Sequence, residues 1–141
     1  MIIADVNVLL KAYRTDAQGH ARCRSWLESV IRADSAFGVS RLVLSAVVRI
    51  STNHRVYNPP SDTAHVLEFC DNLLAQPHCV IVEPGERHWL IFSALCRQTG
   101  IVGGLVTDAW FAALAIEHGC EWITLDRDFA RFRGLKWSVP D

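Results

Sequence analysis

The sequence predicts an α/β fold with a central, mostly parallel sheet, formed by a single domain that covers residues 1–141. Two observations support this fold. Short apolar segments alternate with longer segments of helical spacing, which is typical of strands joined by helical crossovers. The chain also has 141 residues, of which half are hydrophobic and 21% charged, enough to bury one core. We find no repeat or low-complexity segment, and no sign of a second domain.

The first part of the chain predicts two strands and two helices. Residues 2–4 (IIA) form a short apolar segment and predict a buried strand. A helix is expected from just after Asn7 to about Tyr13. Residues 21–31 repeat apolar side chains at helical spacing and predict the second helix. Residues 37–39 (FGV) predict a brief second strand.

The middle of the chain predicts a helix, a long turn, a second helix and a strand. Residues 42–50 are strongly apolar, with Ser40 as a plausible cap, and we interpret them as a helix, although their β-branched residues leave a strand open. Two prolines within residues 51–62 stop that helix. Ser61 or Asp62 can cap the next helix, which runs to Leu74. Residues 80–82 (VIV) predict a buried strand.

The last third predicts the remaining elements. Residues 86–97 are expected to form a helix anchored by its large apolar side chains, and residues 100–104 a glycine-rich loop. Residues 108–118 carry a dense alanine and leucine face and predict a helix that Gly119 ends. Residues 122–125 predict a strand, and residues 135–137 a final edge strand. The strands and helices thus continue to alternate to the end of the chain.

Charge and cysteine content restrict the class of protein. The net charge of −1 gives no overall basic signature for nucleic acid, although a local basic patch remains open. The five cysteines show no CxxC spacing, which argues against a zinc site and for reduced cysteines in a cytoplasmic protein. The apolar start is broken at Asp5, unlike a secretory leader. No apolar run approaches the roughly 20 residues that cross a membrane.

Carboxylates stand where the predicted strands end. Asp5 follows the first strand, Asp126 follows the later strand and Asp128 lies two residues beyond it, while Asp108 opens a helix. In parallel sheets, functional sites form outside the carboxyl ends of the strands. Carboxylates that gather there repel one another unless they are protonated or a cation is present. Carboxylate oxygens are suitable ligands for Mg²⁺ or Mn²⁺. Either cation can assist the hydrolysis of a phosphodiester bond.

Each of these acids also has a structural interpretation. Asp108 alone is compatible with a helix N-cap, Asp126 with the start of a turn, and Asp5 with hydrogen bonds to backbone amides. Taken singly, none of them identifies a site. Their common position at the boundary between strand and helix favours an acidic metal site.

The ordered set of four segments resembles the PIN-domain ribonucleases, and among them the VapC-type toxins of toxin–antitoxin pairs. The matching segments are IIADVNVLLKAY, LVLSAVVRISTN, VTDAWFAALAIEHG and WITLDRDFARFRGLKW. Residues 59–97 match only in their pattern of helix, strand and helix. The resemblance implies a PIN-like α/β/α domain of three layers and an Mg²⁺- or Mn²⁺-dependent endoribonuclease. It further implies cleavage of an RNA target such as tRNA or rRNA, with a 5′-phosphate and a 3′-hydroxyl as products. It also implies a homodimer and a VapB-type antitoxin that covers the acidic pocket.

The resemblance also assigns site residues by position. It places Asp5, Asp108 and Asp126 as the first, third and fourth acids of the family's catalytic quartet. Asp128 resembles an additional acid often found nearby, which makes four expected metal ligands. The expected supporting residues are Asn7, Thr107 and Thr124.

The second acid of the quartet is missing. The family pattern resembles LSEVVRI, whereas this sequence has LSAVVRI, so Ala46 stands where a glutamate is expected. We therefore expect weaker metal binding and slower hydrolysis, from either an introduced substitution or a natural reduction of the site. Arg49 lies one helical turn beyond Ala46. We expect it to form an ion pair with one of the acids, with contact to a phosphate as the alternative.

Other interpretations remain to be weighed. Two basic rims of an RNA groove are conceivable, although surface basic residues are usually just solvated. A signalling receiver domain would require adjacent acids early and an aspartate on a middle strand, and an aspartate phosphatase would require DxDxT; the sequence has neither. A PIN-fold module that binds RNA or antitoxin without cleaving remains open because of Ala46. The candidate rims are Arg14, His20, Arg22 and Arg24, and Arg127, Arg131, Arg133 and Lys136.

Overall fold

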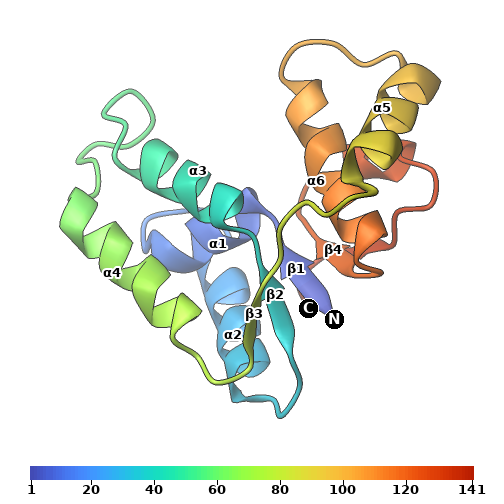
Figure 1. The fold of residues 1–141 in the computed structure, drawn as a ribbon. Coiled ribbons are helices and arrows are strands. Elements are labelled where there is room, and N and C mark those ends of the chain that lie inside the picture. The colour runs from blue at the N-terminus through green and yellow to red at the C-terminus, as the bar shows by residue number, and fades with distance from the viewer.

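A five-stranded sheet with all strands parallel forms the centre of the molecule, in the order β3-β2-β1-β4-β5 (Figure 1). The structure is a computed structural model that describes residues 1–141. The predicted α/β fold is confirmed, and the sheet is more regular than predicted because every strand pair is parallel. The strands are Ile2–Ala4 (β1), Phe37–Val39 (β2), Cys79–Ile81 (β3), Glu121–Ile123 (β4) and Trp137–Ser138 (β5).

Helices cover both faces of the sheet and complete three layers (Figure 1). From β1 the chain steps to β2 and then β3, and afterwards returns to add β4 and β5 on the other side of β1. Because parallel crossovers are right-handed, this reversal puts α1 to α4 on one face and α5 and α6 on the other. The helices are Val6–Tyr13 (α1), His20–Arg32 (α2), Arg41–Ser51 (α3), Thr63–Leu74 (α4), His88–Thr99 (α5) and Leu105–Glu117 (α6), with a 3₁₀ helix at Arg127–Arg131 (η1).

Strands β1 and β4 are direct neighbours at the point where the strand order reverses. Their register pairs Ile3 with Trp122 and Ala4 with Ile123. In open α/β sheets, this reversal leaves a crevice outside the carboxyl ends of the two strands. The segments that follow β1 and β4 therefore meet at one edge of the sheet.

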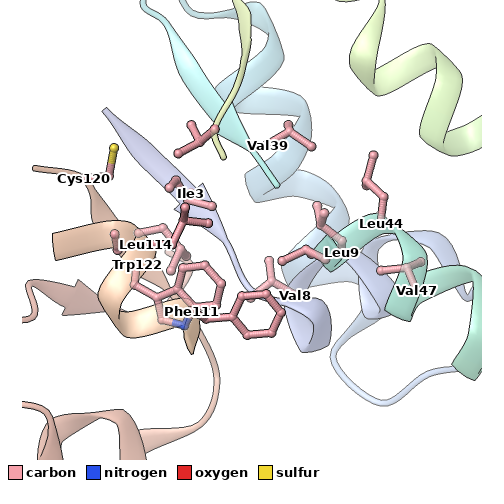
Figure 2. Close-up of a cluster of buried hydrophobic side chains, with 14 of the residues drawn as sticks. Ile3, Val8, Leu9, Val39, Leu44, Val47, Phe111, Leu114, Cys120 and Trp122 are labelled. Atoms are coloured by element: carbon pink, nitrogen blue, oxygen red, sulfur yellow. The ribbon is translucent and has the colours of Figure 1, made fainter. Parts of the chain in front are cut away.

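The core joins the two helical layers through the sheet (Figure 2). Ile3 and Trp122 are fully buried on adjacent strands, and Val8 is fully buried in α1. The Trp122 ring stacks against Phe111 of α6 with a centroid distance of 5.3 Å. The five cysteines form no disulfide, and Cys23, Cys70 and Cys120 are buried, in agreement with the expectation of mostly buried thiols. None of the helices combines the length and apolar composition needed to span a bilayer.

Two apolar segments are more exposed than the sequence predicts. Strand β3 was expected to be buried, but Val80 and Ile81 are 42% and 46% exposed because β3 is an edge strand. In α5 the expected anchors Trp89 and Leu90 are 66% and 70% exposed. Leu95, also expected as an anchor of this helix, is buried, together with His88, which was not expected there.

Glu117, at the end of α6, fixes the start of α5. The N-cap position of α5, Arg87, makes no side-chain capping bond. The Glu117 carboxylate instead accepts hydrogen bonds from the backbone N–H groups of Gly85 (2.7 Å) and Arg87 (2.9 Å). Burial by itself would raise the pKa of Glu117, but the two backbone hydrogen bonds together hold it below its usual value. The two helices of this layer are thus joined through one carboxylate.

Replacing Glu117 by alanine should lower the free energy of unfolding at pH 7 by about 1–3 kcal/mol, because two backbone donors lose a charged acceptor. Chemical denaturation measures this loss, and hydrogen exchange should localise it to the start of α5. Since the folded-state pKa is lowered, the contribution is present at neutral pH and disappears as the pH falls through that pKa, below the ordinary 4.5.

Glu68 provides the control, because it is an exposed glutamate in α4 for which no hydrogen bond or ion pair is found. Glu68→Ala should leave the stability almost unchanged. Equal losses in the two variants would show that Glu117 does not fix α5.

Candidate active site

An open pocket of about 640 Å³ lies at the carboxyl ends of β1 and β4. Its walls come from α1, α3, α6 and η1, and Figure 1 shows α3 and α6 on opposite sides of β1. This is the location that the reversal of strand order predicts. The lining residues are Asp5, Val6, Asn7, Leu10, Leu42, Ser45, Ala46, Arg49, Ile50, Gly104, Thr107, Asp108, Phe111, Asp126 and Phe129.

Asp5 is the most buried acid in this pocket, with only 6% of its surface exposed. It is the N-cap of α1, which begins at Val6, earlier than predicted, and its Oδ1 accepts a hydrogen bond of 2.6 Å from the Val6 N–H. Burial raises the pKa of Asp5 to about 6; hydrogen bonds from Thr124 and Val6 oppose the shift, and the charges of Asp108 and Asp126 add to it. Asp5 therefore caps α1, but its burial makes the charged form of its carboxylate unfavourable.

Asn7 and Thr124 fix the orientation of Asp5. The fully buried Thr124 hydroxyl donates to Asp5 Oδ2 at 2.6 Å, and Asn7 Nδ2 donates to the same oxygen at 3.2 Å. Asn7 Oδ1 in turn accepts from the Leu125 N–H at 3.1 Å, and Thr124 Oγ1 accepts from the Asp126 N–H at 3.0 Å. The network connects the ends of β1 and β4, so both residues have the contacts expected of supporting residues.

Asp108 and Asp126 face the same pocket from two other elements. Asp108 lies in the first turn of α6, which begins at Leu105 and thus earlier than predicted. Burial raises the pKa of Asp108, and the charge of Asp126 adds to the shift. Asp126 caps η1 by accepting a hydrogen bond of 2.9 Å from the Asp128 N–H. The structural interpretation of Asp126 is therefore correct, and its carboxylate still lines the pocket.

Asp128 and Thr107 have more peripheral positions. Asp128 is exposed and is not among the lining residues; its carboxylate lies 3.7 Å from Arg131 Nη2. Thr107 lines the pocket beside Asp108, and no side-chain hydrogen bond to an acid is found for it. The Arg131 charge lowers the pKa of Asp108, although burial and the other acids outweigh it. The sequence analysis placed Arg131 only on a possible RNA rim. It missed the proximity of Arg131 to these acids, although the spacing of three residues between Asp128 and Arg131 could have suggested their ion pair.

The donor set suits a hard divalent cation such as Mg²⁺ or Mn²⁺. Asp5, Asp108 and Asp126 present only oxygen atoms. Burial and the charges of neighbouring acids raise the pKa of Asp5 and of Asp108, a penalty on their charged forms that a cation would relieve. No group of three or more His, Cys, Asp or Glu side chains converges into a metal-binding cluster. The three acids therefore share a pocket without forming a closed ligand set.

Helix α3 forms the wall of the pocket on which the sequence pattern predicts another acid. Ala46 lines the pocket together with Ser45 and Arg49. Position 46 thus faces the acids, as the sequence pattern predicts, but contributes no ligand atom. The predicted ion pair between Arg49 and one of the acids is wrong, because Arg49 lies in none of the ion pairs of the structure.

The first predicted basic rim consists of side chains already bonded within the protein. Arg14 is only 10% exposed, pairs with Asp16 and stacks on the Tyr57 ring. Arg22 donates to the Pro140 carbonyl, and Arg24 pairs with Glu28. In the second predicted rim only Arg131 has such a partner, Asp128. The first rim is therefore poorly suited to RNA binding.

Comparison with known proteins gives consistent matches. The model of the PIN domain matches residues 2–135. Ribonuclease VapC25 of Mycobacterium tuberculosis (strain ATCC 25618 / H37Rv) is 40% identical over 140 residues, which cover 99% of both chains. Ribonuclease VapC31 of the same strain is 39% identical, with the same coverage.

Solved structures share the fold at low sequence identity. VapBC2 from Rickettsia felis, bound to a DNA fragment from its promoter, superimposes with a TM-score of 0.73 at 17% identity and covers all of both chains. VapC20 of Mycobacterium tuberculosis, described as a toxin that cleaves the sarcin–ricin loop, gives a TM-score of 0.64 at 13% identity and covers 96% of this chain and 99% of that one. At these identities, the likeness supports the α/β/α fold.

Replacing Asp5 by asparagine should stabilise the metal-free protein at pH 7 by about 1–3 kcal/mol, because each pKa unit corresponds to about 1.4 kcal/mol. The asparagine can still accept from Val6 through its oxygen and donate to the Thr124 hydroxyl through its nitrogen, while the weaker bond of 3.2 Å from Asn7 is lost. Because the folded-state pKa is raised from 3.8 to about 6, the penalty is fully present above pH 6 and fades as the pH falls towards 3.8. Urea unfolding with a chelator at several pH values measures both effects.

Asp34→Asn is the matched control, since Asp34 is exposed and outside the pocket, and it should not change the stability. If Asp5→Asn destabilises the protein at pH 7, Asp5 is a favourable structural cap and not a strained charge.

Proposed function

The chain belongs to the PIN-domain family and, within it, to the VapC ribonuclease toxins of toxin–antitoxin systems, and on this basis we propose that it is an Mg²⁺- or Mn²⁺-dependent endoribonuclease. The observation that carries the proposal is the pocket at the carboxyl ends of β1 and β4, which three aspartates share. One of them, Asp5, is buried and accepts hydrogen bonds from three donors, and its burial raises its pKa and so disfavours the charged carboxylate. Such an arrangement is typical of a functional site and not of a structure selected for stability.

Different residues of the pocket have different roles in the proposed reaction. Asp5, Asp108 and Asp126 hold the cation, with Asp128 at the rim as a further acid. Asn7 and Thr124 keep Asp5 in one orientation, and Thr107 lies beside Asp108 where it can contact a carboxylate or a phosphate. The apolar side chains of Phe111 and Phe129 also line the pocket.

The proposed chemistry is hydrolysis of an RNA phosphodiester bond. A divalent cation, when bound, neutralises the acids and supplies a water molecule of lowered pKa. In the proposed hydrolysis, the oxygen of a water molecule would add to phosphorus, the bond from phosphorus to the 3′-oxygen would break, and one proton of that water would end on the 3′-oxygen, while Asp5, Asp108 and Asp126 would hold the cation. The products are a 5′-phosphate and a 3′-hydroxyl. The three acids orient this reaction because each is fixed to a different rigid element.

Ala46 favours one alternative, a PIN-fold module that binds RNA or antitoxin without cleaving. A glutamate at position 46 would add a fourth carboxylate to the pocket wall, and Ala46 supplies none. In the leading proposal the chain retains reduced activity through the remaining acids. In the alternative, the loss of this ligand abolishes the activity.

Partners follow from the family. The solved neighbours include toxin–antitoxin complexes, from Rickettsia felis and from Klebsiella pneumoniae. We propose that a VapB-type antitoxin covers the acidic pocket, that the RNA target is a tRNA or an rRNA, and that the protein acts in the cytoplasm. We also propose a homodimer; the exposed apolar side chains of Trp89 and Leu90 on α5 support a protein contact.

Introducing the expected acid tests the proposed activity. Ala46→Glu should increase the rate of RNA cleavage at least about tenfold, because it restores a ligand whose position faces the pocket. A pool of cellular RNAs is incubated with the chain and with the variant in Mg²⁺ and in Mn²⁺, and the cut sites are mapped by sequencing the new ends. Adding Asp5→Asn should abolish the cleavage.

Gln98→Glu controls for added charge, because Gln98 is exposed on α5 and outside the pocket. It should cleave at the rate of the unchanged chain. If the chain binds RNA but does not cleave it, whether or not Ala46→Glu cleaves, the non-catalytic module is the correct assignment of the chain. Cleavage that survives Asp5→Asn would come from a contaminating nuclease and contradict the proposal.

A further inference from the structure

Arg49 is the only cationic residue among the fifteen that line the pocket. It lies in the last turn of α3, on the same wall as Ser45 and Ala46, and its side chain is exposed. The other charged lining residues are three aspartates. The α3 wall therefore presents one positive charge to a pocket that is otherwise acidic.

The guanidinium of Arg49 has no partner within the protein. Five arginines of this chain form ion pairs with carboxylates, and Arg49 is not among them. No hydrogen bond from its side chain is found either. Asp5, the most buried acid of the pocket, already takes its hydrogen bonds from Val6, Asn7 and Thr124. An exposed arginine that faces a pocket and is not used in folding is available for a ligand.

Phosphate is the ligand chemistry that suits this position. A strand of RNA that enters a pocket with three carboxylates meets repulsion, which a cation on the opposite wall reduces. The planar guanidinium binds two phosphate oxygens through parallel N–H groups, a geometry that an ammonium group does not provide. We propose that Arg49 binds a phosphate group of the RNA strand in the pocket and thereby positions it against the acids. This inference rests on the proposed ribonuclease function.

Arg97 offers a matched control. It is also an exposed arginine in the last turn of a helix, α5, it also forms no ion pair, and it does not line the pocket. Replacing either residue by glutamine removes one charge from the end of a helix, so effects on the helix dipole are equal. Any difference between Arg49→Gln and Arg97→Gln then reports on the pocket.

Binding to a short RNA that contains a mapped cut site tests the proposal. The measurement uses fluorescence anisotropy in Ca²⁺, a hard cation that serves as a substitute for Mg²⁺, at several salt concentrations. Arg49→Gln should weaken binding about tenfold, as expected for one hydrogen-bonded charged contact. It should also reduce the slope of log affinity against log salt by about 0.7, the value for one phosphate of a single strand. Arg97→Gln should change neither quantity.

Single methylphosphonate linkages identify the contact. Each neutralises one phosphate of the RNA, and one position should weaken binding to the unchanged chain but have no further effect on Arg49→Gln. Arg49→Lys should recover the salt slope and only part of the affinity. Equal losses for Arg49→Gln and Arg97→Gln, or no coupled position, would overturn the role of Arg49 while leaving the ribonuclease proposal intact. Absence of both RNA binding and cleavage in the unchanged chain would overturn the proposed function and this inference with it.

Discussion

The hydrogen bond of 2.6 Å from the buried Thr124 hydroxyl to Asp5 is the interaction on which the rest of the site depends. It joins the ends of two strands that are adjacent in the sheet but 119 residues apart in the chain. The same hydroxyl oxygen accepts from the Asp126 N–H, so it also sets where the segment after β4 begins. One side chain thus fixes two of the three acids relative to each other.

In the proposed site, this arrangement would favour the binding of a cation at the expense of the stability of the metal-free protein. Asp5 is used as a helix cap, which favours the charged carboxylate, yet it is buried next to two further acids, which disfavours it. A site that relieves this conflict by taking up a cation gains affinity from strain already present in the fold. The wall formed by α3 has the opposite character. It has Ala46 in place of an acid, and beside it an arginine without a partner. The pocket therefore has one acidic side and one weakly basic side.

Much of this site could be predicted from the sequence because it follows strand ends. Asp5 and Asp126 end apolar segments, and the parallel sheet brings those ends together whatever the details of packing. Two features depended on side-chain contacts that a linear pattern does not contain. Arg49 was expected to pair with an acid, but Asp5 takes its hydrogen bonds from Thr124 and Asn7. Trp89 and Leu90 were expected in the core together with Leu95, but only Leu95 is buried, beside His88, and the packing against α6 decides this.

Titration of the metal-free protein with Mn²⁺ shows whether the three acids act as one site. We expect saturable binding that Mg²⁺ displaces and that Asp108→Asn and Asp126→Asn each weaken at least about tenfold, because each removes one ligand. An exposed control, Asp34→Asn, should bind as the unchanged chain does. Binding that survives both pocket substitutions, or no binding at all, would contradict a shared metal site and leave Asp5 and Asp126 as structural caps only.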